Sequence, residues 1–370
     1  MRQARIALSR GLSATAQQKV EHEPDVALLL ATHAVRLDSS LTSRSALLAA
    51  LQANPRLQRL IGDRAFAGDF SPDGKRFATA GQGGSISIWD TATWKRLIHI
   101  QQAHQDEIWG LVFVPGGKQL VTASLEKTAA VWDVESGKQV GQRMTGHADQ
   151  VLCAAVSPDG RILATGGLDA SIRLWDMDQR RAIRTIAISH QGGVRSLVFS
   201  PDGSRLVSGG FDGAIRVWDA ASGEPRPGPE KSHAGGVMRL AFKRDGSLLA
   251  SAGSDGAIRF WNPLTWKQEG KPFDEFQRDI GGLAFSPDGK QLAAGGWDGV
   301  VRLWNLGPED EITGKVFRYH KNQVWQVAFS PDGTSLASVG WDETMGLWDT
   351  KSSNGKPGFR SGIGWSDSME

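Results

Sequence analysis

Apolar and polar residues alternate with a period of two through most of the chain, which is typical of short strands with one buried face. Val194-Arg-Ser-Leu-Val-Phe199 shows the pattern, and it resumes at Arg205-Leu-Val-Ser208 and Ala214-Ile-Arg-Val-Trp218. Turn residues separate these stretches, as in Ser200-Pro-Asp-Gly203, where proline presets φ and glycine supplies a positive-φ position. The pattern therefore predicts antiparallel meanders of short strands.

The same unit recurs along the chain and ends each time on a tryptophan between an apolar residue and Asp or Asn. Successive copies are 43 residues apart, and the last interval is 44. The repeat also explains a composition with 14 Trp, one Tyr and 45 Gly. The repeated tryptophans are Trp89, Trp132, Trp175, Trp218, Trp261, Trp304 and Trp348.

Residues 2–53 follow a different pattern. Apolar positions such as Val26, Leu30, Ala34 and Leu37 recur at helical spacing. Pro24 and the Ser/Thr-rich residues 38–42 predict helix breaks, so we expect three helices. The sequence thus predicts a helical segment over 1–55, repeats over 56–349 and a flexible Gly/Ser-rich tail over 350–370.

Charge and cysteine content narrow the class of protein. The 42 Lys and Arg residues nearly balance 40 Asp and Glu, which argues against an electrostatic nucleic-acid partner. Cys153 is the single cysteine, so no intrachain disulfide is possible, and a reducing, cytoplasmic location is expected. No apolar run approaches the roughly 20 residues that span a bilayer, and polar residues follow the basic N-terminus, so neither membrane nor export is predicted.

A repeat of this length with four strands and a terminal Trp-Asp resembles the WD40 repeat family. The resemblance covers Leu57 to Asp349 and implies an all-β fold, a seven-bladed WD40 β-propeller preceded by a short α-helical segment. Sheets arranged around an axis cover faces that a lone sheet would expose. We expect Arg56-Leu-Gln-Arg-Leu-Ile61 to add the fourth strand of the last blade and remove the free edges. The propeller is expected to be monomeric.

The resemblance implies a structural tetrad of His, Ser/Thr, Asp and Trp in each blade. Mutual hydrogen bonding of buried polar groups makes such sets structural, so no catalytic residue, metal ligand or cofactor is predicted. Four blades carry the complete set: His147, Thr165, Asp169 and Trp175; His190, Ser208, Asp212 and Trp218; His233, Ser251, Asp255 and Trp261; and His320, Ser338, Asp342 and Trp348.

Three blades depart from this tetrad, and we expect them to be locally weaker. Blade two has Glu126 in place of Asp, beside His104, Thr122 and Trp132. Blade six and blade one lack two members each: Phe276 and Ala294 replace His and the hydroxyl in blade six, and Ile61 and Gly83 replace His and Asp in blade one.

The resemblance also implies that a protein or peptide partner binds the top face. The family positions are the third and fifth residues after the tetrad His and the neighbours of the tetrad Asp. Aromatic residues gather there in blades six, seven, one and two, with charged residues around them, as in a protein-binding hot spot. The predicted contact residues are Phe66, Trp109, Trp325, Trp341, Trp297, Phe211, Arg64, Glu107, Arg195 and Leu152.

These observations predict a non-catalytic interaction module or scaffold with a possible sensing role in signalling. One alternative is a propeller enzyme, such as a metal-dependent hydrolase or lactonase, but the predicted innermost strands contain no His or Glu and only Asp69. Another is an autoinhibitory module for a separately encoded NTPase. Leu28–Leu37 and Arg44–Leu51 resemble the helical connector of bacterial STAND-type signalling NTPases, although this chain has no P-loop motif.

Overall fold

The computed structural model describes residues 2–19, 24–38, 40–46, 57–187, 189–229, 232–307, 312–351 and 359–361. The chain divides into two compact units. One comprises Met1–Leu60 and Gly346–Lys356, and the other comprises Ile61–Met345 and Pro357–Glu370. None of the described helices combines the length and apolar character needed to cross a bilayer.

The first unit contains two paired helices, α1 (Arg2–Lys19) and α2 (Pro24–Leu37). Small residues line their contact, since Ala16 and Ala31 are fully buried. The Ser9 hydroxyl donates a hydrogen bond of 2.8 Å to the Ala34 carbonyl, which ties the two helices together. Residues 41–46 are also helical, and the Ser40 hydroxyl accepts the Ser43 N–H at their start.

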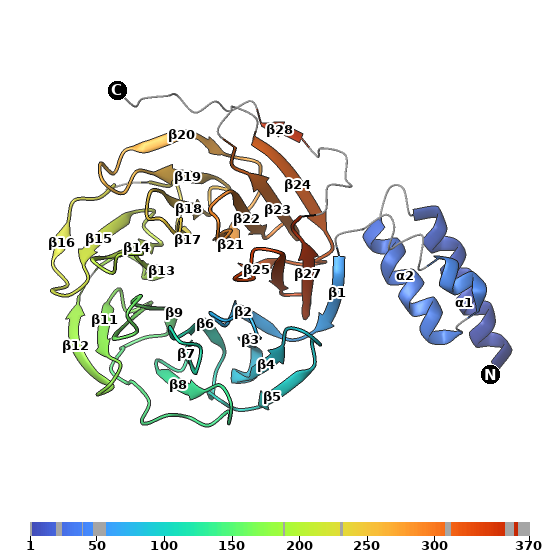
Figure 1. Ribbon diagram of the computed structural model, residues 1–370, viewed down its shortest axis with the longest axis horizontal. Coiled ribbons are helices and arrows are strands. Elements are labelled where there is room, and N and C mark those ends of the chain that lie inside the picture. Colours follow the sequence, from blue (N-terminus) through green and yellow to red (C-terminus); the bar gives the residue numbers. More distant parts are fainter. Residues whose placement is uncertain are drawn as a thin grey trace. The chain divides into compact units, whose positions relative to one another are not determined.

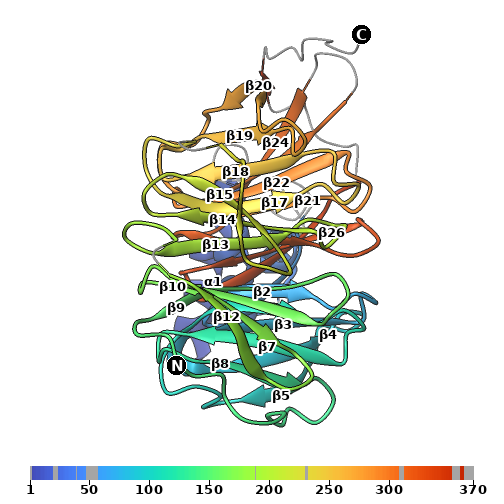
Figure 2. The ribbon, with the colours of Figure 1, turned by 90° about the vertical axis from the view of Figure 1, so that its left-hand side faces the viewer.

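Seven antiparallel sheets stand around a central axis and form the blades of a β-propeller (Figure 1). Figure 2 shows β13, β14 and β15 side by side in that order. Blade one consists of β2 (Ala65–Phe70), β3 (Arg76–Gly81), the 3-10 turn η1 (Gln82–Gly84), β4 (Ile86–Asp90) and β5 (Arg96–Ile100). Blade two consists of β6 (Ile108–Phe113), β7 (Gln119–Ser124) and β8 (Ala129–Asp133). Blade three consists of β9 (Val151–Val156), β10 (Ile162–Gly167), β11 (Ile172–Asp176) and β12 (Arg181–Ile186).

The remaining four blades continue the same meander. Blade four consists of β13 (Val194–Phe199), β14 (Arg205–Gly210), β15 (Ile215–Asp219) and β16 (Pro225–Arg226), and blade five consists of β17 (Val237–Phe242), β18 (Leu249–Gly253), β19 (Ile258–Trp261) and β20 (Gln268–Phe273). Blade six consists of β21 (Ile280–Phe285), β22 (Gln291–Gly296), β23 (Val300–Asn305), β24 (Ile312–Arg318) and β28 (Phe359–Ser361). Blade seven consists of β25 (Val324–Phe329), β26 (Ser335–Gly340), β27 (Thr344–Asp349) and β1 (Leu57–Gly62).

Strand order decides two of the sequence predictions. The last sheet has the order β1-β27-β26-β25, so the prediction that the residues around Leu57 supply its fourth strand is confirmed. Part of the expected loose tail is instead paired, because Phe359 and Arg360 of β28 lie opposite Gly314 and Thr313 of β24. Blade six therefore has five strands, whereas blade two has three.

The Ser-Pro-Asp-Gly turns fold through local hydrogen bonds. In the first, the Ser71 hydroxyl donates to Asp73 over 2.7 Å and accepts the Arg76 N–H over 2.9 Å. Gly74 has a φ of 71°, which a residue with a side chain adopts only at a cost. The same Ser–Asp bond recurs at Ser157, Ser200, Ser286 and Ser330, so these turns are alike.

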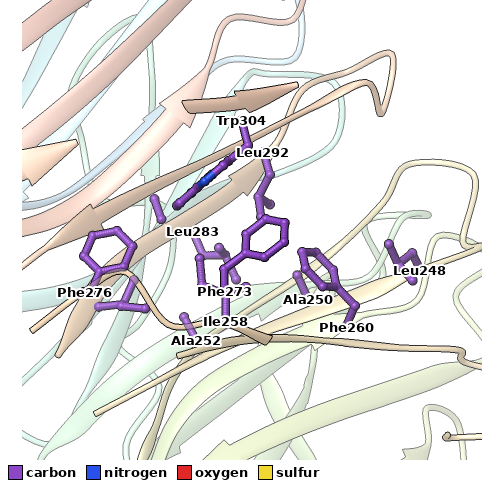
Figure 3. Close-up of a cluster of buried hydrophobic side chains, with 12 residues drawn as sticks. Leu248, Ala250, Ala252, Ile258, Phe260, Phe273, Phe276, Leu283, Leu292 and Trp304 are labelled. Atoms are coloured by element: carbon purple, nitrogen blue, oxygen red, sulfur yellow. The ribbon is translucent and has the colours of Figure 1, made fainter. Parts of the chain in front are cut away.

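Apolar residues between neighbouring blades form the core. Figure 3 shows the cluster between blades five and six, where Phe260, Phe273 and Trp304 pack together. The Phe273 and Trp304 rings lie 5.3 Å apart, and Trp304 is fully buried. Every blade thus covers the next one, which satisfies the requirement that two-sided sheets have no exposed apolar face.

The tetrads join strands within a blade. In blade four, His190 Nδ1 lies 2.8 Å from Asp212, and His190 Nε2 lies 2.8 Å from the Ser208 hydroxyl, which also accepts the Trp218 N–H over 2.9 Å. A carboxylate only accepts hydrogen bonds, so Nδ1 carries the imidazole proton and Nε2 accepts the hydroxyl proton. Burial lowers the pKa of His190 and favours this neutral form. The bonds recur around His147 and His233.

Blade two completes its tetrad with a longer carboxylate. Glu126 lies 2.7 Å from His104 Nδ1, and the Thr122 hydroxyl accepts the Trp132 N–H over 2.8 Å. Arg143 donates to the same Glu126 oxygen over 2.5 Å. Glu126 therefore completes the tetrad of blade two, although the sequence pattern has Asp at this position.

Blade one uses Asp63, which the tetrad pattern did not predict, in place of the histidine. The Thr79 hydroxyl accepts the Trp89 N–H over 2.9 Å and donates to the Asp63 carboxylate. Asp63 lies two residues after Ile61, the position at which histidine was expected. Burial raises the pKa of Asp63, and the hydrogen bond from Thr79 opposes this shift. A carboxylate thus receives the hydroxyl proton that an imidazole receives elsewhere.

Blade six has lost this network. Ala294 stands where other blades have a hydroxyl, and the buried Trp304 Nε1 has no well-formed hydrogen bond. Phe276 takes the place of the histidine, with its ring 6.1 Å from that of Trp304. Packing has largely replaced hydrogen bonding here, and the only acceptor near the buried Trp304 N–H among the described residues is the Glu275 carboxylate, which does not form a well-aligned bond with it.

Ser208→Ala should destabilise the protein by about 1–3 kcal/mol, because it removes the partner of two buried polar groups, Trp218 Nε1 and His190 Nε2. Urea denaturation measures this loss. Ser204→Ala is the matched control, since Ser204 is exposed and should cost less than about 0.5 kcal/mol. Equal denaturation midpoints for the two variants would contradict the structural role of the tetrad.

Ala294→Ser should stabilise the protein by about 0.5–1.5 kcal/mol, because the new hydroxyl can accept the Trp304 N–H. Ala293→Ser, on the opposite face of β22, buries a hydroxyl at a fully buried apolar position and should destabilise the protein. Thermal melting of both variants checks the prediction. A loss of stability in Ala294→Ser as large as that in Ala293→Ser would refute it.

Candidate functional site

Each innermost strand contains a bulge that leaves one residue out of the ladder. In β13, for example, Val194 pairs with Gly210 and Ser196 pairs with Gly209, so Arg195 has no opposite residue. Such a bulge re-aims the side chain of its extra residue. These residues, here called the bulge ring, are Phe66, Trp109, Leu152, Arg195, Met238, Gly281 and Trp325.

Five aromatic side chains form one contiguous group, here called the aromatic cluster: Phe66, Trp109, Trp297, Trp325 and Trp341. Trp325 lies at its centre, with ring centroids 5.1 Å from Trp109, 5.0 Å from Trp297 and 5.7 Å from Trp341. Phe66 stacks on Trp341 at 5.0 Å. The structure therefore brings together all five of the predicted aromatic positions in blades six, seven, one and two.

Gly281 explains how so many large rings fit. A Cβ atom at this position would lie 2.3 Å from the Val324 carbonyl oxygen and 3.2 Å from Trp297 Nε1. The absence of a side chain in this member of the bulge ring leaves room for Trp297 beside Trp325. The glycine thus shapes the aromatic cluster.

Burial divides the predicted contact residues into two groups. Trp341 and Phe211 are exposed by 43% and 39%, and Arg64 is also exposed. Trp109, Trp297 and Glu107 are half-buried. The buried residues are Phe66, Leu152, Arg195 and Trp325. The buried group supports the surface from below, and the exposed and half-buried group forms the surface itself.

Charged residues lie beside the aromatic cluster. Arg64 pairs with Glu343 over 3.1 Å, and both side chains are more than half exposed. Glu107 accepts the Trp109 indole N–H over 3.0 Å, which fixes the orientation of that ring. Arg195 places its guanidinium carbon 5.3 Å from the Trp109 ring centre. The surface is therefore an apolar centre with fixed polar groups at its edge.

Two predicted residues lie apart from the aromatic cluster. Phe211 lies beside Gly192 of its own blade and Gly236 of blade five, and it has no aromatic ring contact among the described residues. Leu152 is buried in the bulge ring. Arg239, directly after Met238, was missed: it donates to the Trp325 carbonyl over 3.1 Å. In the sequence, only the position of Arg239 directly after the bulge residue indicated that it lies near the aromatic cluster.

The arrangement offers little for acid–base or metal chemistry. Within the described part of the chain, no three His, Cys, Asp or Glu side chains are grouped so as to hold a metal ion. The His–hydroxyl pairs of the tetrads are buried, with each hydroxyl engaged by a tryptophan N–H. Asp69, the acid of the innermost strands, accepts the Phe113 N–H over 3.3 Å, and burial raises its pKa to about 6.

Comparison with known proteins agrees with this geometry. The family model described as "WD domain, G-beta repeat" matches seven stretches: residues 64–90, 95–133, 137–176, 181–219, 230–262, 270–305 and 313–349. The chain belongs to the WD40 repeat family. No curated protein matches it significantly. WD40 propellers are typically protein-interaction modules and are generally non-enzymatic.

Four of the matched WD40 stretches, 95–133, 181–219, 270–305 and 313–349, contain all or part of the outer strand of one blade followed by the three inner strands of the next. The segment 181–219, for instance, contains β12 of blade three and then β13–β15 of blade four. The repeat along the sequence is therefore offset by one strand from the blade in space. In these four stretches the offset links successive WD40 blades covalently, since one repeat contributes strands to two sheets.

Trp325→Ala and Trp341→Ala should differ sharply in their effect on this WD40 propeller. Trp325 is buried among four aromatic rings, so its truncation leaves a cavity and should cost about 3–5 kcal/mol. Trp341 is 43% exposed and should cost about 1 kcal/mol, chiefly through its stacking on Phe66. Chemical denaturation of both variants measures the difference, and similar losses would contradict the distinction between support and surface.

Proposed function

We propose that this WD40 propeller is a non-catalytic module that binds a protein or peptide on the face carrying Trp341. The observation that carries the proposal is the aromatic cluster, in which an exposed indole rests on buried rings. A rigid aromatic surface loses little conformational entropy when a partner covers it. Trp and Arg are also the side chains enriched in the energetic centres of protein interfaces.

The shape and charge of the surface favour a partner that inserts an apolar or aromatic side chain. Trp341 and Phe66 are stacked at an interplanar angle of 22°, so Trp341 has one ring face covered by Phe66. Arg64 and Glu343 present opposite charges beside it. A partner residue can pack against the remaining indole surface while polar groups on either side bond to the exposed pair.

The face is defined by strand direction. Successive turns of an antiparallel blade lie at alternate ends. Trp341 lies in the turn between β26 and β27, which corresponds to the turn between β18 and β19 in blade five. Leu264 lies in the next turn of that blade, between β19 and β20, and is therefore on the opposite face. Leu264 is 82% exposed and so provides a matched apolar control.

Trp341→Ala should abolish or strongly weaken capture of binding proteins from a lysate of the source cells, while Leu264→Ala should retain it. A photo-cross-linking residue at Phe211, 39% exposed in blade four, should label the same partner, whereas one at Leu264 should not. The captured proteins are identified by mass spectrometry. Equal capture by both alanine variants, or labelling only from position 264, would refute the assignment of this face.

The proposal also covers the domain bounds, the oligomeric state, the location and the signalling role of the protein. We propose a helical domain over 1–55, a propeller over 56–349 and a tail over 350–370, in a monomeric cytoplasmic protein. The single buried Cys153 is compatible with a reducing compartment. The structure has helices at residues 24–37 and 41–46, within the segment that the apolar spacing predicted to be helical. We infer a role as a signalling sensor from the STAND-type resemblance, without nucleotide hydrolysis by this chain.

A further inference from the structure

Arg195 occupies an unusual position in the bulge ring. Its side chain begins on β13 in blade four and reaches Trp109 of blade two and Trp325 of blade seven, so it crosses the centre of the ring. Only 1% of the residue is exposed, and the buried Nη1 atom has no hydrogen-bond partner. A buried guanidinium donor without an acceptor is costly, so the site has an unfilled bonding requirement.

Arg239 brings a second guanidinium to the same place. It donates from Nη2 to the Trp325 carbonyl and from Nη1 to the Met238 carbonyl, each over 3.1 Å. Its Nε donates to the Gln326 side chain over 3.3 Å. All of these acceptors are neutral. Both arginines contact Trp325, because the Arg195 guanidinium carbon lies 5.9 Å from its ring centre and Arg239 bonds to its carbonyl. Burial lowers the pKa of Arg239, and the positive charge of Arg195 lowers it further.

No carboxylate neutralises this pair. Asp279 attracts Arg195, but within the described parts of the chain neither Arg195 nor Arg239 forms an ion pair with an acidic group. Burial lowers the pKa of Arg195 to about 10, which still leaves it charged at neutral pH. Two like charges in a largely buried site therefore have no carboxylate in direct ion-pair contact among the described residues, and Asp279 acts on Arg195 only from a greater distance.

We propose that a small oxyanion binds on the propeller axis between Arg195 and Arg239, beneath Trp325. The planar guanidinium matches the oxygen pairs of phosphate, sulfate and carboxylate groups, and it holds them through two parallel hydrogen bonds. The anion accepts a bond from Arg195 Nη1 and neutralises the repulsion between the two arginines. The rings of Trp109 and Trp325 lie against the Arg195 guanidinium and lower the local polarity, which strengthens both effects. This site does not depend on the proposed partner surface.

The test is thermal melting of the purified full chain in a zwitterionic buffer, with chloride replaced by phosphate, sulfate or acetate at constant ionic strength. The wild type should show a saturable rise in Tm of about 2–8 °C with a bound oxyanion. Arg195→Met and Arg239→Met should lose this rise. Arg184→Met is the control, because Arg184 lies on the outer strand β12 with a side chain 46% exposed, and it should behave as wild type.

A second readout separates the site from a purely structural role. Without oxyanions, Arg195→Met should melt at or above the wild-type Tm, since it replaces an uncompensated buried charge by an apolar chain of similar length. If it does not fold, Arg195→Lys serves instead: it keeps the charge, loses the planar fork and should bind phosphate at least tenfold more weakly by calorimetry. Phosphate and acetate arms show whether a tetrahedral ion or a carboxylate is preferred.

Two results would refute the proposal that an oxyanion binds between Arg195 and Arg239. The first is a wild-type Tm that does not respond to phosphate, sulfate or acetate beyond its response to chloride. The second is an equal rise in the wild type and in the Arg195, Arg239 and Arg184 variants, which indicates a general salt effect on stability.

Discussion

The structure depends on the need of each small sheet to bury two apolar faces. A four-stranded meander cannot do this alone, and the blades of the propeller do it for one another. Trp304 of blade six illustrates the result, because it packs against Phe273 of blade five and is fully buried. Packing between neighbours therefore sets the arrangement of the sheets, and the polar tetrads act within a core that this packing has already made dry.

The tetrads show how much chemical variation such a core accepts. Glu126 serves in place of Asp by bonding to His104 Nδ1. Asp63 serves in place of His from a shifted position by accepting the Thr79 hydroxyl proton, and in both blades the hydroxyl still accepts the tryptophan N–H. Blade six instead discards the hydroxyl, and Phe276 fills the space. What every blade requires is a filled volume, and several residue types supply it.

The bulge ring connects this scaffold to the surface. One extra residue in every innermost strand lies outside the ladder, and the six side chains and one glycine found there decide what that end of the propeller presents. Large rings in blades seven, one and two build the aromatic cluster, and Gly281 makes space for Trp297. Arg195 reaches the same region from the far side and brings a positive charge beneath the aromatic surface.

The sequence by itself determined the repeat, the number of blades, the short meanders and most tetrads, because alternation, turn residues and a recurring Trp are local signals. It also located the aromatic positions, since each lies at a fixed distance from a tetrad residue. Only the tertiary structure decided which of them are support and which are surface: Trp325 and Trp341 have equivalent sequence signals, yet one is enclosed and the other is 43% exposed. The roles of Asp63 and Arg239 were equally hidden, because their partners come from distant strands. Burial and charge pairing depend on how the blades converge around the axis, and no local pattern records that.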